Sequence, residues 1–159
     1  METTNLRPTF LTVLCVLTFI ASSFGIYNAV TSYTSAEMAV DVAKDAMDEA
    51  QDQIEAEGEE MPGFVGKLLS GVTEGLTVEN MQNMALGSGL GNILTLIGAI
   101  VMWGLNKKGY FVYLAGHAVL ILAPLFIYEG FVGAAASGGA VFVAVLFGVL
   151  YGLNLKHMS

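Results

Sequence analysis

The chain has 159 residues, of which 55% are hydrophobic and only 13% are charged, whereas soluble domains carry about 25% charged residues. The formal net charge is −8, from 14 acidic and 6 basic residues, which argues against nucleic-acid binding because that requires a basic surface. Only one cysteine is present, so no disulfide can form within the chain.

Charged residues are missing from four stretches of the chain. These stretches cover residues 9–36, 80–106, 109–128 and 130–155. About 20 apolar residues let an α-helix cross a hydrocarbon core of about 30 Å. The sequence therefore predicts an all-α fold, a four-helix transmembrane bundle that forms a single membrane domain over residues 1–159 and contacts membrane lipid.

The first span is expected over residues 10–30. Pro8 suits the first turn of this helix, where its missing N–H leaves no hydrogen bond unmade. Arg7 and the apolar run after it also resemble a secretory signal peptide. Because the run continues to Val30, which makes it long enough to span a membrane, we expect an uncleaved signal-anchor helix.

A helical insert is predicted over residues 31–85, between the first and second spans. It holds twelve of the 14 acidic residues. From Ser35 to Glu57, apolar residues recur at alternating spacings of four and three, which predicts a helix with a heptad seam for docking a protein partner. This seam comprises Ala36, Val40, Ala43, Met47, Ala50 and Ile54. The helix is expected to end at a turn near Gly58 and Pro62, and a short amphipathic helix is expected over residues 64–76.

Acidic side chains cover the opposite face of the first insert helix. The spacing of a calcium-binding EF-hand loop is absent, and acids that follow one helix face do not converge on an ion. We therefore predict no metal site and favour a solvated face, which leaves open a diffuse attraction for cations or docking to a basic partner. Enzyme signatures such as G-x-S-x-G and the Walker A loop are also absent, so we expect no enzyme.

Three closely spaced spans are expected over residues 86–105, 110–128 and 131–153. The helix that contains the second span is expected to begin after Thr77, a predicted N-cap with Glu79 in the first turn. The connections between these three spans are very short. Consecutive spans must therefore be antiparallel neighbours.

Charge at the ends of the spans predicts their orientation. The acidic insert and Glu129 fall at one set of ends, and four basic residues fall at the other: Arg7, Lys107, Lys108 and Lys156. Positively charged loops stay on the cytoplasmic side. Both termini are therefore expected in the cytoplasm, with residues 31–85 outside it.

Small residues recur at every fourth position of the fourth span. Such spacing lets helix backbones approach closely in a membrane. The stripe comprises Ala136, Ala140, Ala144, Gly148 and Gly152, and a second set of small residues, Ala85, Gly87, Gly89 and Gly91, opens the second span. We favour packing within the bundle over docking of a partner subunit, although both could occur on different faces.

His117 is the one ionisable residue deep inside a predicted span, which makes it a candidate for binding haem or quinone or for relaying protons. A bis-histidine haem site needs a second histidine at matching depth, and His157 lies near the membrane surface instead. A relay needs an intramembrane acid, and none is present. We favour a neutral histidine that is hydrogen-bonded to a neighbouring helix, and we predict no bound cofactor. The other polar residues considered, Asn28, Asn92 and Asn154, are expected near span ends.

Three short pieces of the sequence carry a resemblance. The opening run from Arg7 to Cys15, the turn from Asn106 to Tyr110 and the closing run from Leu153 to Lys156 resemble those of small four-span membrane proteins common among Bacteroidota. The resemblance implies a Gram-negative inner membrane, with the acidic insert in the periplasm. It implies no activity and no functional residues.

Three functions are compatible with these patterns. We favour a non-enzymatic structural or accessory subunit of an inner-membrane complex, which docks a protein partner through its periplasmic acidic helix. One alternative is a small homo-oligomeric channel or transporter in which the acidic helices form a vestibule that attracts cations. The other is a subunit of a redox complex that uses His117 near haem or quinone.

Overall fold

The computed structural model describes residues 8–56, 63–128 and 130–159. Within these ranges the elements are helical and no strand occurs, which confirms the all-α prediction. Four described helices are long and apolar enough to cross a membrane: Thr9–Thr34 (α1), Val78–Trp103 (α4), Lys108–Ile127 (α5) and Gly130–Asn154 (α6). The chain is therefore a multi-pass membrane protein. The predicted roles of Arg7 and Glu129, and the turn at residues 58–62, lie outside the described residues.

The spanning helix α1 is longer than the span predicted over residues 10–30, and the helix α4 begins where the sequence predicts. The helix α1 continues past residue 30 to Thr34, and the hydroxyls of Thr31 and Thr34 donate to carbonyls of their own helix. The helix α4 begins at Val78, because the side chain of Thr77 caps it by accepting a 3.1 Å hydrogen bond from the N–H of Asn80. The predicted cap is thus confirmed, and so is the prediction that the helix of the second span begins after Thr77.

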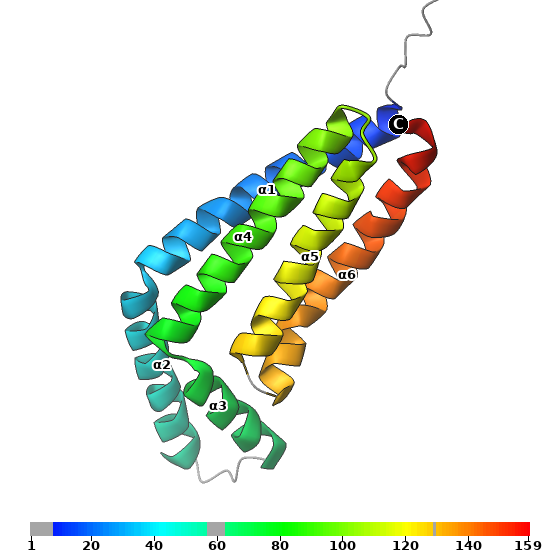
Figure 1. Cartoon of the computed structure of the whole chain (residues 1–159). Coiled ribbons are helices and arrows are strands. Elements are labelled where there is room, and N and C mark those ends of the chain that lie inside the picture. Colours follow the sequence, from blue (N-terminus) through cyan, green and yellow to red (C-terminus); the bar gives the residue numbers. More distant parts are fainter. Residues whose placement is uncertain (1–7, 57–62, 129) are drawn as a thin grey trace, which may run out of the picture.

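The spanning helices are arranged in the order α1, α4, α5, α6 (Figure 1). The pairs α4–α5 and α5–α6 are the antiparallel neighbours that the short connections require. We call the end of the bundle that holds residues 8–12 and 155–159 the terminal end, and the opposite end the insert end. At the terminal end α1 and α6 meet, and toward the insert end they diverge (Figure 1).

Two further helices, Ala36–Ala56 (α2) and Gly63–Gly75 (α3), lie at the insert end (Figure 1). Only Ser35 separates α2 from α1, and its N–H and hydroxyl both donate to the carbonyl of Thr31. The N-terminal part of α2 packs on α1 and α4, where Ala36 and Val40 are buried. The helix α3 contacts the start of α6.

The turns between the last three spans are tight. Between α4 and α5, Leu105 adopts a positive φ of 61°, and its carbonyl accepts a 2.8 Å hydrogen bond from the N–H of Ser159. Ser159 follows the 3-10 helix Leu155–His157 (η1), and its carbonyl accepts from the N–H of Lys107. At the start of α6, Gly130 has a φ of 62°, a conformation that costs glycine nothing.

A row of small residues brings the backbones of α4 and α5 into direct contact. A side-chain carbon on Gly116 would lie 2.7 Å from the backbone nitrogen of Thr95, and one on Gly91 would lie 3.0 Å from the carbonyl oxygen of Gly116. Further along, one on Gly87 would lie 2.7 Å from Cβ of Ala123. This contact positions α4 and α5 as a rigid pair, on which α1 and α6 pack from either side.

The best-buried apolar cluster lies at the terminal end, where α1 meets α6. Its buried members are Leu11, Leu14, Cys15, Met102, Tyr113, Tyr151 and Met158. In contrast, large apolar side chains elsewhere on the spans are exposed, as in Ile20 (65%), Phe126 (82%) and Phe142 (68%). Such exposure suits a surface that faces lipid rather than water.

Candidate functional site

Polar side chains gather around a cavity of about 130 Å³ that is lined by all four spanning helices. These polar side chains are Thr18, Ser22, Asn92, Thr95, Tyr113 and His117. Apolar side chains complete the wall: Leu17, Ala21, Leu120, Val143 and Phe147. Ser22 lies near the middle of α1, and His117 is at the middle of α5. The cavity therefore lies at depth in the membrane-spanning part of the bundle.

One side of the cavity is a chain of hydrogen bonds between α1 and α4. The Thr95 hydroxyl donates to the carbonyl oxygen of Asn92 at 2.9 Å, and it lies 2.8 Å from the hydroxyl of Ser22. Because the Thr95 hydroxyl has one proton, which it gives to the carbonyl, the Ser22 hydroxyl must donate to Thr95. Gly25 makes room for this contact, since a side-chain carbon there would collide with the side chain of Asn92.

A second set of polar contacts joins α1, α5 and α6. The hydroxyls of Thr18 and Tyr151 lie 2.8 Å apart, and the centroid of the Tyr151 ring lies 4.9 Å from that of Tyr113. The Tyr113 ring in turn lies 4.4 Å from the His117 ring. Tyr113 thus lines the cavity and also belongs, with Tyr151, to the apolar cluster at the terminal end.

The hydrogen bonds of His117 fix the roles of its two ring nitrogens. Nδ1 lies 3.3 Å from the carbonyl oxygen of Tyr113, which can only accept, so Nδ1 carries the proton. In the neutral ring, Nε2 is then an acceptor. Its nearest donor is the Tyr113 hydroxyl at 3.5 Å, which is longer than a good hydrogen bond of about 2.7–3.2 Å. His117 is only 6% exposed, so Nε2 is a buried acceptor whose one partner in the described part of the chain is weak.

The structure corrects two expectations, one for His117 and one for Asn92. The prediction of a hydrogen bond to a neighbouring helix is wrong for the described residues, because both bonds of the His117 ring join Tyr113 on its own helix. Asn92 was expected near a span end, but it lines the same cavity as His117. The reason is that the span predicted over residues 86–105 covers only part of the helix that begins at Val78, and Asn92 lies near the middle of that helix. His157 is exposed in η1 and does not line the cavity.

The small-residue stripe of α6 faces α5 at the terminal end. A side-chain carbon on Gly148 would lie 3.6 Å from Leu114, and one on Gly152 would lie 3.6 Å from the Tyr110 hydroxyl. Further along the stripe, Ala144 and Ala140 are half-buried and Ala136 is exposed. The tightest approach of α6 to α5 is made by Gly133, outside the stripe, which packs on the carbonyls of Tyr128 and Pro124. Docking of a partner on the exposed part of the stripe stays a prediction.

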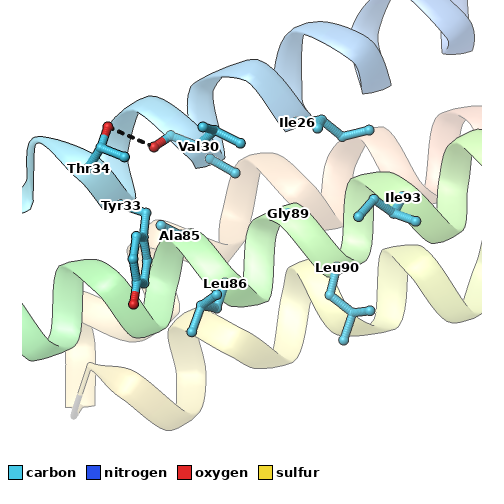
Figure 2. A pocket seen from close by; sticks show the side chains of 10 residues that line it. Ile26, Val30, Tyr33, Thr34, Ala85, Leu86, Gly89, Leu90 and Ile93 are labelled. Atoms are coloured by element: carbon cyan, nitrogen blue, oxygen red, sulfur yellow. Dashed lines mark hydrogen bonds between the residues drawn. The ribbon is translucent and has the colours of Figure 1, made fainter.

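An apolar groove of about 430 Å³ lies between α1 and α4, nearer the insert end (Figure 2). Its floor is opened by Gly89, where a side-chain carbon would lie 3.3 Å from Cβ of Ala29. The Thr34 hydroxyl at its edge is occupied by a 3.0 Å bond to the carbonyl of Val30 (Figure 2). The groove thus offers apolar contact and suits a lipid chain, as does the rest of the apolar surface.

The seam of α2 is partly covered within the chain. Ala36 and Val40 are 1% and 2% exposed, and the Met47 sulfur lies 3.8 Å from the hydroxyl of Thr73 on α3. The remaining seam residues are half-buried or exposed: Ala43, Ala50 and Ile54. The seam therefore holds α2 against the bundle at its first turns, and docking of a partner on the rest stays a prediction.

The opposite face of α2 is exposed. Its exposed acidic residues are Glu37, Asp41, Asp45, Asp48, Glu49 and Asp52. No group of three or more metal-binding side chains occurs in the part of the chain that the structure describes. The face is thus a row of separate carboxylates and does not form a cage for one ion.

Compared with protein-family models, curated proteins and solved structures, the chain has no match in any of the three.

Proposed function

We propose that the protein is a non-enzymatic accessory subunit of a bacterial inner-membrane complex, and that the acidic face of α2 docks a basic partner in the periplasm. One observation carries this proposal. The acidic row is exposed along α2, while Ala36 and Val40 on the other face of the same helix are buried in the bundle. The row is therefore presented at a fixed position beside the spans.

The proposed orientation has support from the placement of the lysines. Lys107, Lys108 and Lys156 all lie at the terminal end, where the Lys107 N–H donates to the carbonyl of Ser159. The acidic row lies at the insert end. By the positive-inside rule, lysines beside the ends of spans stay in the cytoplasm. We therefore infer that the terminal end is cytoplasmic and that the insert end faces the periplasm.

The proposed docking is electrostatic. A row of carboxylates on one helix face creates a negative potential, which steers a positively charged partner and fixes its register. Because the carboxylates are exposed, salt largely screens their attraction for charges more than about 8 Å away at physiological ionic strength. Binding through this face is therefore expected to weaken as salt is added.

The test compares the native complexes of two variants in which exposed acids are neutralised, either inside or outside the row. In the first, Asp41, Asp45, Asp48 and Asp52 are changed to Asn, which removes the charge and keeps the size. In the control, Glu74 and Glu79, exposed acids outside the row, are changed to Gln. After mild detergent extraction and blue-native electrophoresis, the native chain and the control are expected to migrate in a larger complex, which the first variant loses. A native chain that migrates alone, with no co-purifying protein, would contradict the proposal.

A further inference from the structure

The cavity beside His117 has an acceptor that the chain leaves poorly satisfied. Nε2 of His117 is buried, and its one partner among the described residues is the Tyr113 hydroxyl at 3.5 Å. A buried acceptor without a good donor costs free energy, and buried polar groups in proteins nearly always find a partner. We therefore expect the cavity to bind a molecule that donates a hydrogen bond to Nε2.

The mouth of the cavity opens on lipid. Leu17 and Ala21 of α1 and Val143 of α6 line the cavity and are also exposed on the surface of the spans. These are the two helices that diverge from the terminal end toward the insert end (Figure 1). A molecule that enters between them comes from the hydrocarbon layer, so it must be soluble in the membrane.

The size and lining of the cavity limit what fits. A cavity of about 150 Å³ binds benzene, and this cavity, at about 130 Å³ and open at its mouth, is only slightly smaller, so one six-membered ring is the largest group that it suits. Leu120, Val143 and Phe147 supply an apolar wall for such a ring. The same lining also carries the hydroxyls of Ser22 and Thr95 and the imidazole of His117. Water alone would make hydrogen bonds but little apolar contact, whereas a hydroxylated ring makes both.

We propose that this cavity binds the hydroxylated ring of a membrane-soluble phenol or quinol. The ring hydroxyl donates to Nε2 of His117, and the apolar tail extends between α1 and α6 into the lipid. Binding requires no redox step. This proposal does not depend on the docking function of α2, because none of the residues that line the cavity belongs to α2.

The test measures binding of two probes that differ only in the donor. In lipid nanodiscs, the full chain is titrated with 4-pentylphenol or with 4-pentylanisole, whose methyl ether cannot donate. The ¹⁵N signals of the His117 ring report binding, and exposed His157 serves as the internal reference. We expect the His117 signals to shift and saturate with the phenol, and the anisole to bind at least ten-fold more weakly.

Blocking the mouth gives a second measurement that leaves every polar group in place. Ala21→Phe puts a ring at the exposed edge of the cavity and is expected to weaken phenol binding at least ten-fold. Ala118→Phe, a matched change at an exposed position of α5 that does not line the cavity, is expected to leave binding unchanged.

A third probe, pentylhydroquinone, distinguishes the two sources of the ring. If pentylhydroquinone binds more tightly than 4-pentylphenol, the second hydroxyl is also bonded and the ligand is a quinol. If the two affinities are equal, the ligand is a monophenol. Equal affinities for the phenol and the anisole would overturn the proposal. So would signal changes that never saturate and are the same in the Ala21→Phe variant, and the cavity would then hold only water.

Discussion

Gly98 of α4 and Gly109 of α5 touch through their backbones. A side-chain carbon on Gly109 would lie 2.5 Å from the carbonyl oxygen of Gly98, and one on Gly98 would lie 2.8 Å from the carbonyl oxygen of Gly109. Between helices in lipid the hydrophobic effect contributes little, so van der Waals contact of this kind is a main source of association. This contact holds together the helix pair on which the rest of the bundle packs.

Gly98→Ala is expected to destabilise the protein by about 1–3 kcal/mol, the usual cost of overpacking. The added methyl meets backbone atoms of Gly109 and Tyr113, which cannot move aside as a flexible side chain can. Unfolding by sodium dodecyl sulfate in mixed micelles measures the change. Gly138→Ala in α6 is the control, because nothing lies within 4 Å of its added carbon. Equal stabilities of the two variants would show that α4 and α5 are not in contact at Gly98.

The contact between Gly87 and Ala123 allows a rescue experiment. Gly87→Ala alone is expected to destabilise, because the new methyl would lie 2.7 Å from Cβ of Ala123. Adding Ala123→Gly moves the methyl from one helix to the other and is expected to restore most of the lost stability. The same unfolding assay applies to both single variants and the double variant. Strictly additive losses would contradict a direct contact between these positions.

The sequence predicts the four spans and their antiparallel neighbours but not which faces meet. The lengths of the apolar runs and of the connections between them can be read from the sequence, so the spans α4, α5 and α6 and their antiparallel pairing are predictable. In a membrane, however, apolar residues cover every face of a span, so hydropathy does not mark the packed side. Gly98, Gly109 and Gly116 form the closest backbone contacts between α4 and α5, and none of them belongs to the regular stripe that the spacing selects.

Thr18→Val and Tyr151→Phe test the hydrogen bond that joins α1 to α6. Each change removes one of two hydroxyls that lie 2.8 Å apart at buried positions. Interhelical bonds in membrane proteins average about 0.6 kcal/mol in double-mutant cycles, so we expect a coupling energy of that size. The cycle is measured by the same unfolding assay. A coupling energy near zero would argue that α1 and α6 are separated at this level.

Only part of the candidate cavity could be predicted from the sequence. His117 stands out because an ionisable residue in an apolar run is rare. Ser22 and Thr95 do not stand out, because single hydroxyl residues are common in spans and can bond to their own helix. Their partnership depends on α1 lying beside α4, and the long insert between these helices leaves that placement undetermined by connection length.

Thr77→Ala tests the cap that begins α4. The change removes the oxygen that accepts from the N–H of Asn80, and loss of such a cap costs about 1 kcal/mol. Thr77→Ser keeps the oxygen and is expected to retain stability. Hydrogen exchange at the first turn of α4 is expected to rise in the alanine variant and not in the serine variant. Equal exchange in both would mean that tertiary contacts alone hold this turn.

Single cysteines at the two ends of the bundle test the proposed orientation. Cys15 is 0% exposed, so the native chain is expected not to react with the maleimide and serves as the control. Asp45→Cys on α2 and Lys156→Cys in η1 both replace exposed side chains. In spheroplasts of a Gram-negative host, a membrane-impermeant maleimide is expected to label position 45 directly and position 156 only after lysis.

Lys108→Cys provides an independent check of the same orientation from the turn between α4 and α5. This position is exposed at the terminal end, so it is expected to behave like position 156 and to react only after lysis. The reason is the positive-inside rule acting on three lysines at that end against the acidic row at the other. Labelling of position 108 in intact spheroplasts, together with protection of position 45, would reverse the orientation and place the acidic face of α2 in the cytoplasm. The partner would then have to be a cytoplasmic protein.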